Sequence, residues 1–367
     1  MKFSIARDAL LQPLNLVAGV VERRQTLPIL ANVLLVLDED RLSLTGTDLE
    51  VELLGRVKLE TAGEAGEVTV PARKLVDICK SLPEGSDIQL EAQENKVTIK
   101  SGRSRFTLAT LPAREFPNVE DSLGTHQFTV KQGQLKRLID RTGFAMAQQD
   151  VRYYLNGMLW EIKDALLRVV ATDGHRLAMC TLDNKLAPSD DTQVILPRKG
   201  VLELARLLLD SEADIAIVIG SNHIRATTEH FTFTSKLVDG KFPDYQRVLP
   251  RSPDKVVLGS RVELRQAFTR AAILSNEKYR GVRLKVTPDS LDIVANNPEQ
   301  EEAEESVSVE YKGEPLEVGF NVSYLLDVLG VLSGEQVKLS LSDPNSSALL
   351  EESESDDSLY VVMPMRL

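Results

Sequence analysis

The residues best suited to chemistry in this chain are four histidines and two cysteines, and their spacing fits no common catalytic or metal-binding motif. They are His126, His175, His223, His230, Cys79 and Cys180. The histidines lack the short intervals of a metal site, and the two cysteines are too far apart in sequence to act as a zinc pair. No Walker loop and no G-x-G-x-x-G follows a strand pattern, which argues against a nucleotide site.

One stretch, Asp173-Gly174-His175, supports two interpretations. Its Asp and His could belong to a hydrolase triad, but no G-x-S-x-G elbow or other activated serine accompanies them. The alternative is a polar turn in which Asp173 binds its own backbone and Gly174 adopts a positive φ. We favour the turn, and the sequence therefore predicts no catalytic residue, no metal and no cofactor.

The composition is that of an ordinary folded protein of 367 residues, long enough for two or three domains. No apolar run is long enough to span a membrane and the first residues do not form a signal peptide, so no membrane partner is expected. Cys79 and Cys180 lie in apolar surroundings, which predicts two buried thiols in a cytoplasmic protein rather than a disulfide. The net charge of −12 by itself argues against a nucleic-acid partner.

The stretch before the Asp173 turn belongs to an internal repeat. The run from Leu42 to Asp48 recurs as Leu167 to Asp173 and as Leu291 to Asn297, at spacings of 125 and 124 positions. Three further helix starts, after Pro71, Pro197 and Asn321, recur at nearly the same period, and the pairs Phe116-Pro117, Phe242-Pro243 and Met363-Pro364 mark the ends. Several marks in one register indicate three copies, which we expect as domains 1–122, 123–250 and 251–367.

Within each copy the hydrophobic pattern predicts a strand, a helix, several strands, a second helix and several more strands. The six predicted helices span residues 7–24, 71–82, 131–149, 198–210, 261–275 and 321–333. Two helices packed on antiparallel sheets form an α+β fold, so three similar domains of this kind are expected.

The predicted helices hold 16 basic and 8 acidic residues, although the whole chain is acidic. Basic residues on one helix face are ordinarily just solvated surface. The repetition in register, as in Arg73, Asp77 and Lys80 against Lys199, Glu203 and Arg206, favours a layer that holds a polyanion. A similar exposed cluster is predicted for Lys136, Arg137, Asp140 and Arg141; the last helix departs from the pattern with Asp327 alone.

Three more stretches suggest binding surfaces. The chain ends in Tyr360–Leu367, which is apolar to the last residue; a final core strand explains its start, and an adaptable groove for a peptide partner explains its methionines. The run Arg103–Leu108 reads as a basic strand edge and Glu299–Glu305 as an acidic run. Such runs are usually solvated loops, but this pair also suits head-to-tail association, which can close into a ring.

Several motifs resemble one family, the bacterial DNA polymerase III beta subunits or sliding clamps. They are Thr26-Leu27-Pro28-Ile29-Leu30, Leu44 to Glu50, Asp150 to Gly157, Ala171 to Leu177, Phe242-Pro243-Asp244-Tyr245, Asn296 to Glu302 and Met363 to Leu367. The resemblance covers the whole chain. It implies a DNA-clamp fold and a head-to-tail homodimer that forms a ring, with helices lining the hole, and a non-catalytic subunit of a DNA polymerase holoenzyme.

The resemblance also implies partners: double-stranded DNA, encircled without sequence specificity; a second copy of the chain; and the replicative polymerase alpha subunit, the clamp-loader delta subunit and other polymerases and repair proteins that carry the clamp-binding motif. Residues implied to face DNA are Arg24, Arg73, Gln149, Tyr153, Tyr154, Arg198 and Lys199.

A peptide-binding cleft between the second and third domains is implied at Leu155, Thr172, Gly174, His175, Arg176, Leu177, Pro243, Arg247, Val248, Val361, Met363, Pro364, Met365, Arg366 and Leu367. A dimer interface is implied at Arg103, Arg105, Phe106, Leu108, Ile273, Leu274, Glu299, Glu301, Glu302, Glu304 and Glu305. The rival interpretations are a hydrolase that depends on His175 and a scaffold that does not bind DNA.

Overall fold

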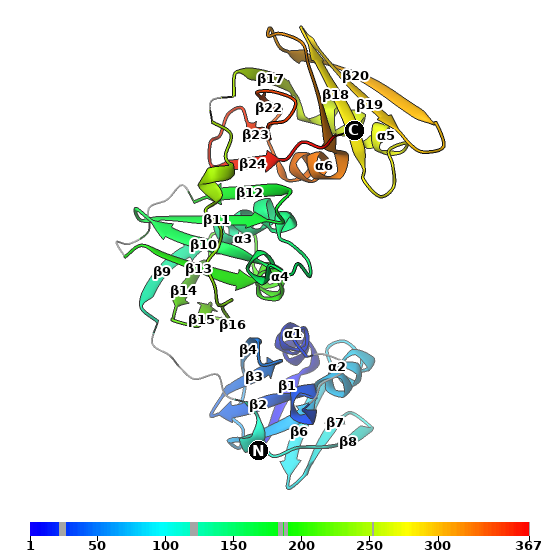
Figure 1. Cartoon of the computed structure of the whole chain (residues 1–367). Coiled ribbons are helices and arrows are strands. Elements are labelled where there is room, and N and C mark those ends of the chain that lie inside the picture. Colours follow the sequence, from blue (N-terminus) through cyan, green and yellow to red (C-terminus); the bar gives the residue numbers. More distant parts are fainter. Residues whose placement is uncertain (22–26, 118–123, 183–185, 187–189, 252, 367) are drawn as a thin grey trace. The chain divides into compact units, whose positions relative to one another are not determined.

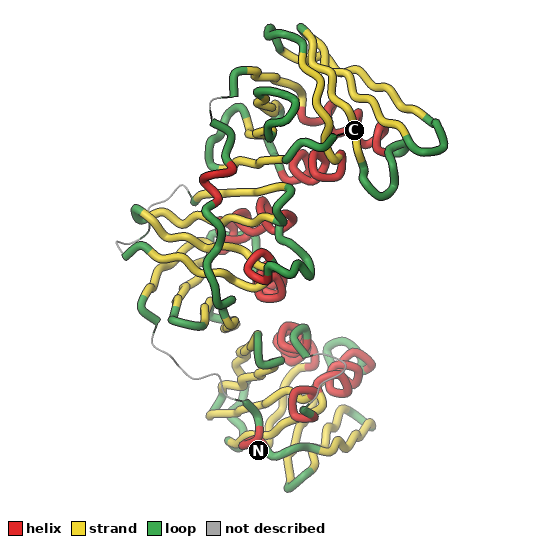
Figure 2. The backbone as a smooth tube through the Cα atoms, in the orientation of Figure 1, coloured by secondary structure: helices red, strands yellow, loops and turns green. Residues whose placement is uncertain are grey.

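The computed structural model describes residues 1–21, 27–117, 124–182, 186, 190–251 and 253–366. Over these residues one order of elements occurs three times: a strand, a helix, four strands, a helix and three strands (Figures 1 and 2). We call the three runs the first, second and third repeats. They confirm the predicted threefold α+β pattern.

The first repeat contains β1 (Lys2–Ala6), α1 (Arg7–Ala18), β2 (Asn32–Asp38), β3 (Arg41–Thr47), β4 (Val51–Lys58), β5 (Gly66–Pro71), α2 (Ala72–Ser81), β6 (Asp87–Gln93), β7 (Lys96–Ser101) and β8 (Ser104–Ala109). The second contains β9 (His126–Lys131), α3 (Gln132–Thr142), β10 (Gly157–Lys163), β11 (Leu166–Thr172), β12 (Arg176–Thr181), β13 (Thr192–Pro197), α4 (Arg198–Leu207), β14 (Asp214–Ile219), β15 (His223–Thr227) and β16 (Phe231–Lys236). The third contains β17 (Lys255–Ser260), α5 (Arg261–Ala272), β18 (Gly281–Thr287), β19 (Ser290–Asn296), β20 (Glu302–Glu310), β21 (Leu316–Asn321), α6 (Val322–Val331), β22 (Gln336–Leu341), β23 (Ala348–Glu352) and β24 (Ser358–Val362).

The chain forms two compact units, residues 1–133 with 202–237 and residues 134–201 with 238–367, so the division passes through the second repeat. The first unit holds a four-stranded sheet in the order β1-β6-β7-β8 and an eight-stranded sheet in the order β5-β2-β3-β4-β16-β15-β14-β9. The second unit holds a twelve-stranded sheet in the order β13-β10-β11-β12-β24-β23-β22-β17-β20-β19-β18-β21. The strand pairings are antiparallel, as expected for helices placed on antiparallel sheets.

Two strand pairings join successive repeats, and they have the same form. In the first unit β4 pairs with β16, with Leu53 opposite Phe233. In the second unit β12 pairs with β24, with Ala178 opposite Tyr360. In each case the strand after the Asp turn of one repeat meets the last strand of the next repeat.

The six helices form because their apolar residues recur at helical spacing and are covered by the sheets. In α1 the predicted face of Leu10, Leu14 and Val17 is buried, and in α3 the same is true of Leu135, Leu138 and Ile139. All six helices are shorter than predicted, and α1 and α3 differ most from their predicted ranges of 7–24 and 131–149, although residues 22–24 lie outside the described residues. The ends of these two helices, Ala18 and Thr142, are each followed by a glycine, which favours helix termination.

Both cysteines are free and buried, as predicted. Burial raises the pKa of Cys79 and of Cys180 to about 11. No helix in the described part of the chain is long and apolar enough to cross a membrane.

Candidate functional site

Each of the equivalent strands β3, β11 and β19 is followed by a turn, and the side chain of the first residue after the strand accepts hydrogen bonds from the backbone of that turn. Asp48 Oδ1 accepts hydrogen bonds from the backbone N–H groups of Glu50 and Val51. Asp173 Oδ1 accepts from the N–H groups of His175 and Arg176 at 2.9 and 3.0 Å, and Asn297 Oδ1 accepts from Glu301. The expected polar turn is therefore present in all three repeats.

The second turn differs from the others by one glycine. Gly174 has φ +88°, which favours glycine, and a Cβ there would lie 2.9 Å from Arg152 Nη2, so the end of the Arg152 side chain would have to shift. His175 is exposed, and the carboxylate of Asp173 is held by backbone N–H groups and by Arg176 Nε at 3.2 Å. That arrangement leaves Asp173 poorly placed to orient an imidazole, and no cluster in the described residues could hold a metal ion.

A small cavity of about 150 Å³ lies against this turn, entirely within the second unit. It is lined by Arg152, Leu155, Thr172, Gly174, Arg176, Leu177, Phe242, Pro243, Asp244, Tyr245, Val248, Val361 and Met363. Leu155, Leu177 and Val361 are buried and belong to one hydrophobic cluster beneath it. An apolar floor with charged groups at its edge suits an apolar side chain of a peptide.

Nine of the predicted cleft residues line this cavity, and five described ones do not. Lining it are Leu155, Thr172, Gly174, Arg176, Leu177, Pro243, Val248, Val361 and Met363. His175 lines a neighbouring hollow instead, and Arg247 is exposed and paired with Asp244 at 2.9 Å. Pro364, Met365 and Arg366 lie in the tail beyond the cavity, where the Met365 N–H donates to Gly319 O, and Leu367 lies outside the described residues.

The ends of the repeats are less alike than the sequence suggested. Phe242 lies in an irregular segment well after β16, whereas Met363 directly follows β24 and its N–H donates to His175 O. Met363-Pro364 is therefore not the structural equivalent of Phe242-Pro243. The two pairs instead reach the same cavity from different elements, with Pro243 and Met363 both in its lining.

Charged side chains flank the cavity. Asp150 accepts two hydrogen bonds from the guanidinium of Arg152, and these bonds lower the pKa of Asp150 to about 2. Arg152 Nη2 also donates to Asp173 O at 3.2 Å, which holds its side chain over the turn. Arg152 was not among the predicted cleft residues, although it lies within the Asp150–Gly157 motif.

Arg176 connects the turn to the third repeat. Its guanidinium lies over the rings of Phe144 and Tyr324, at 5.2 and 4.5 Å from their centroids. It also donates to Phe144 O and to the carboxylate of Asp327 on α6. The acidic residue that set the last helix apart in the sequence is thus a partner of a cleft arginine.

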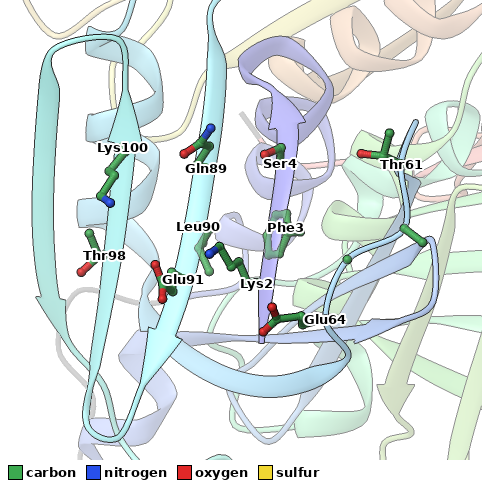
Figure 3. Close-up of a pocket in the computed structure, with 12 residues that line it drawn as sticks. Lys2, Phe3, Ser4, Thr61, Glu64, Gln89, Leu90, Glu91, Thr98 and Lys100 are labelled. Atoms are coloured by element: carbon green, nitrogen blue, oxygen red, sulfur yellow. The ribbon is translucent and has the colours of Figure 1, made fainter.

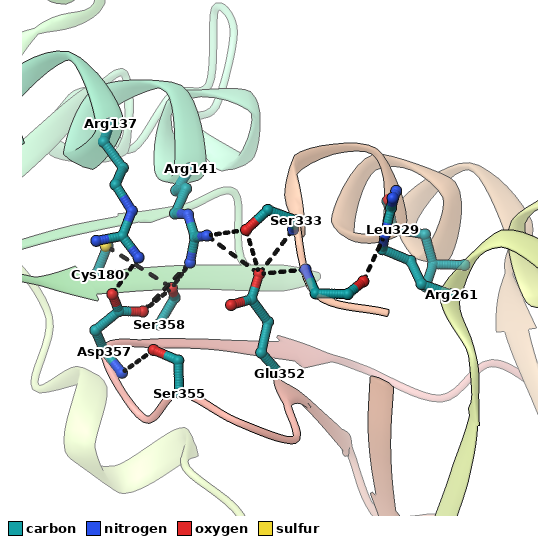
Figure 4. A network of polar contacts seen from close by, with 11 residues as sticks. Arg137, Arg141, Cys180, Arg261, Leu329, Ser333, Glu352, Ser355, Asp357 and Ser358 are labelled. Carbon is teal, nitrogen blue, oxygen red and sulfur yellow. Dashed lines mark hydrogen bonds and ion pairs between the residues drawn. The ribbon is translucent and has the colours of Figure 1, made fainter. Parts of the chain in front are cut away.

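The basic cluster predicted on the exposed face of α3 is partly wrong, because Arg141 is buried (Figure 4). Its guanidinium is 3.1 Å from Glu352 Oε1 and 3.3 Å from Asp357 Oδ1, and it donates to Ser333 and Ser358. Arg137 pairs with the same Asp357. These arginines bind carboxylates more than 200 positions away, which a helical pattern cannot reveal, and so join the second repeat to the third.

The residues predicted to face DNA differ in their exposure to solvent. Arg73 is exposed on α2, and Gln149 and Tyr153 are exposed in the segment between α3 and β10. Tyr154 is half-buried against the hydrophobic cluster under the cavity and meets the ring of Tyr153 edge-on. Arg198 and Lys199 begin α4 and are half-buried, and Arg24 lies outside the described residues.

One hollow is lined both by residues predicted to face DNA and by residues predicted for the peptide cleft. It has a volume of about 480 Å³, and its lining includes Gln149, Arg198, His175, Arg176 and Tyr324. Arg198 is fixed by a hydrogen bond of 3.3 Å to Met146 O.

The predicted interface residues lie on β8, on β20, in the turns next to these strands and directly after α5. β8 is the outer strand of its sheet, with Arg103 and Arg105 exposed and Phe106 and Leu108 half-buried. Ile273, after α5, is 75 % exposed, and Leu274 is half-buried. Glu299, Glu301, Glu302 and Glu304 are exposed, while Glu305 pairs with Arg270 at 2.7 Å, and this pairing lowers the pKa of Glu305.

A separate, polar hollow of about 640 Å³ lies beside β1 in the first unit (Figure 3). Lys2, Glu64, Glu91 and Lys100 line it with both signs of charge. None of these residues was singled out in the sequence.

Comparison with known proteins decides the family. Models of the DNA polymerase III beta subunit match in chain order: its N-terminal domain over residues 1–120, its central domain over 129–244 and its C-terminal domain over 246–366. The chain belongs to the DNA polymerase III beta subunit family. The family accounts for the three similar α+β runs found along the sequence.

Relatives in this family match the chain from end to end. A beta sliding clamp of Pseudomonas aeruginosa is 67% identical and one of Escherichia coli K12 is 55% identical, each with 100% of both chains covered. The crystal structure of the P. aeruginosa DNA polymerase III subunit beta matches with a TM-score of 0.98 over 100% of both chains. That of the C. crescentus beta sliding clamp, 38% identical, matches at 0.96 over 100% of this chain and 99% of that one.

Proposed function

We propose that this chain is a sliding clamp, the processivity subunit of a bacterial replicative DNA polymerase. Two copies associate head to tail into a ring that encircles duplex DNA, and a peptide cleft on each copy holds the polymerase near the primer end. One observation carries the proposal. Two junctions of the same form lie within the chain, β4 with β16 and β12 with β24. The two strand edges that could form a third, β8 and residues 302–308 of β20, have no strand partner on that side among the described residues.

The free edges are β8 in the first repeat and most of β20 in the third. The order β1-β6-β7-β8 ends at β8, and β20 pairs on its second side only through Val309 and Glu310, with β17. Because β16 and β24 are the equivalents of β8, and β4 and β12 the equivalents of β20, the repeat itself predicts that β8 of one copy pairs with β20 of another.

The register of this contact follows from the pairings within the repeats. Phe106, Phe233 and Tyr360 occupy equivalent positions in the last strands of their repeats. From each of them a line of directly paired residues crosses the sheet and ends at the same position in the first strand of the repeat. Leu53, Ala178 and Ala303 are equivalent, because each pairs with the residue two before its Asp or Asn turn. Since Leu53 faces Phe233 and Ala178 faces Tyr360, Ala303 should face Phe106 of the second copy.

This register gives a complementary seam. One step along the strands, Arg105 lies opposite Glu304 of the second copy, a favourable cross-strand pair. Phe144 stacks on Tyr360, with ring centroids 6.0 Å apart. Ile273 occupies in the third repeat the position that Phe144 occupies in the second. The highly exposed Ile273 would therefore cover Phe106 of the second copy.

DNA binding is supported by the charge distribution. Lysine and arginine side chains at phosphates hold a duplex without reading its sequence, so the ring can slide. Arg73, Arg198 and Lys199 at the helix starts serve this role, and the exposed Tyr153 can stack on unpaired bases. We place the domain boundaries near residues 122 and 250 and the protein in the bacterial cytoplasm, on the nucleoid.

The cleft is proposed to take the short clamp-binding motif of the polymerase alpha subunit, the clamp-loader delta subunit and other polymerases and repair proteins. Holding a polymerase to an encircling ring raises its local concentration at the primer end, which gives processivity without catalysis. Two relatives, from Pseudomonas aeruginosa and Bartonella birtlesii, were crystallised with griselimycin. We expect griselimycin to bind this chain and to compete with the peptide.

The decisive test is topological. The protein is loaded onto nicked circular DNA by a clamp loader, and the retained fraction is measured by gel filtration before and after the DNA is linearised. A clamp stays on the circle and leaves the linear molecule, whereas retention on linear DNA with free ends would refute encirclement.

A further inference from the structure

One wall of the peptide cavity comes from a segment that has little secondary structure. Phe242, Pro243, Asp244, Tyr245 and Val248 all line the cavity. Over residues 237–251 this segment contains one 3₁₀ turn, Tyr245–Val248, and otherwise runs as irregular chain (Figure 2). No strand pairing holds residues 242–248 in the described part of the chain, so side-chain contacts position this wall, among them the packing of Phe242 and Tyr245 in the hydrophobic cluster.

A polar contact of this wall is made by the hydroxyl of Tyr245. Tyr245 is 5 % exposed, and its hydroxyl donates to Glu161 Oε2 at 2.6 Å. The same hydroxyl accepts from Arg168 Nη1 at 3.0 Å. Glu161 is 3 % exposed, so its carboxylate depends on these partners in place of water.

Glu161 and Arg168 belong to a polar row that crosses four strands. Gln193, Glu161, Arg168 and Thr181 stand directly opposite one another on β13, β10, β11 and β12. Their side chains are linked in the same order: Gln193 donates to Glu161, Arg168 donates to Glu161 at 3.2 Å, and Arg168 Nε donates to Thr181 at 3.1 Å. A row fixed by the sheet register is a rigid support for the Tyr245 hydroxyl.

We propose that this polar row positions the segment 242–248 through Tyr245, and that it thereby sets the shape of the peptide cavity. Tyr245, Glu161 and Arg168 are positioning residues for peptide recognition: the ring of Tyr245 forms part of the wall, and its hydroxyl determines where the wall stands. The inference rests on the proposed function of the cavity as the site for the clamp-binding motif.

The test uses Tyr245→Phe, which removes one hydroxyl and keeps the ring. The full-length protein is titrated with a fluorescein-labelled peptide carrying the clamp-binding motif of the alpha subunit, and anisotropy gives Kd. We expect Kd to rise about tenfold, because the wall then spends less time in the binding position. The matched control is Tyr311→Phe, since Tyr311 is also buried and its hydroxyl donates to Glu314 O at 2.6 Å, among residues that do not line the cavity. Its Kd should be that of the unchanged protein.

A second measurement separates positioning from general stability. The peptide residue whose apolar side chain enters the cavity is replaced by alanine, and the loss of affinity is measured with both proteins. If Tyr245 positions the wall, that replacement costs less affinity in Tyr245→Phe than in the unchanged protein. An equal loss in both, or an unchanged Kd in Tyr245→Phe, overturns the inference while leaving the proposed function intact. Failure of the unchanged protein to bind the peptide would instead overturn the proposed function. Glu161→Gln, checked for an unaltered melting temperature, should weaken binding in the same way and should not add to Tyr245→Phe.

Discussion

Reversing the charge of Arg105 should weaken the dimer by an amount that follows from the proposed register. In that register Arg105 lies opposite Glu304 of the second copy, and a head-to-tail dimer contains two such seams. A cross-strand pair of opposite charges contributes about 0.2–1 kcal/mol, and like charges oppose pairing by a similar amount. Arg105→Glu therefore changes the free energy of association by about 0.4–2 kcal/mol at each seam and about 1–4 kcal/mol in total. Because both side chains are exposed and screened by salt, the lower half of this range is expected at physiological ionic strength, where Kd should rise about tenfold.

The assay is sedimentation over a dilution series, and mixing gives its sharpest form. Arg105→Glu alone and Glu304→Arg alone each place like charges at both seams, so each should dissociate more readily. In an equimolar mixture of the two variants both seams of the heterodimer regain opposite charges, so association should return to that of the unchanged protein. Lys163→Glu makes the same change of charge on an exposed residue away from the strand edges and should have no effect. A mixture as weak as its separate components would refute the register.

Three further predictions concern the cavity, the buried ion pairs and the thiols. Gly174→Ala should lower peptide affinity about tenfold in a titration with the labelled peptide, because it adds strain at a positive φ and displaces Arg152. The control is Gly85→Ala, which has a similar positive φ with open space around it and should leave the affinity unchanged. Burial alone would raise the pKa values of Glu352 and Asp357, but hydrogen bonds and Arg141 lower them below their usual values of 4.5 and 3.8. The two carboxylates therefore stabilise the fold above those usual values, and this stabilisation is lost as the pH falls through the lowered values. The melting temperature should drop below about pH 4, and it should drop less in Arg141→Met. With thiol pKa values of about 11, Cys79 and Cys180 should resist iodoacetamide at pH 8 and both react in denaturant, as mass spectrometry can verify.

The fold could be predicted from the sequence because its signals are local and occur three times. Apolar spacing within single helices, as at Leu10 and Leu14, and the recurring strand before Asp48, Asp173 and Asn297 each need only a short window. The ends of α1 and α3 were misplaced because the apolar residues Val21 and Met146 continue the helical spacing beyond Ala18 and Thr142, although each α-helix ends before the following glycine.

The site was predicted mainly through resemblance, and its omissions have a common cause. Arg152, Phe242, Asp244 and Tyr245 line the cavity from segments without regular periodicity, so no pattern assigns them a direction. Arg141 was placed on the surface because a helical arginine ordinarily is. Its carboxylate and hydroxyl partners in the third repeat compensate for the cost of burying its charge, and contacts across such a sequence distance are visible only in the structure.

The sense in which the strand edges join has a consequence for traffic on DNA. Every junction, within the chain and at the proposed seam, links the strand after a polar turn to the last strand of the following repeat. In the proposed head-to-tail ring neither copy is inverted relative to the other, so that ring has two different faces. Each copy contributes the cavity beside its Asp173 turn, and in the proposed ring both of these cavities open on the same face. The proposed partners, polymerase, loader and repair proteins, therefore approach that ring from a single side, so they bind in one orientation and compete for the same two cavities.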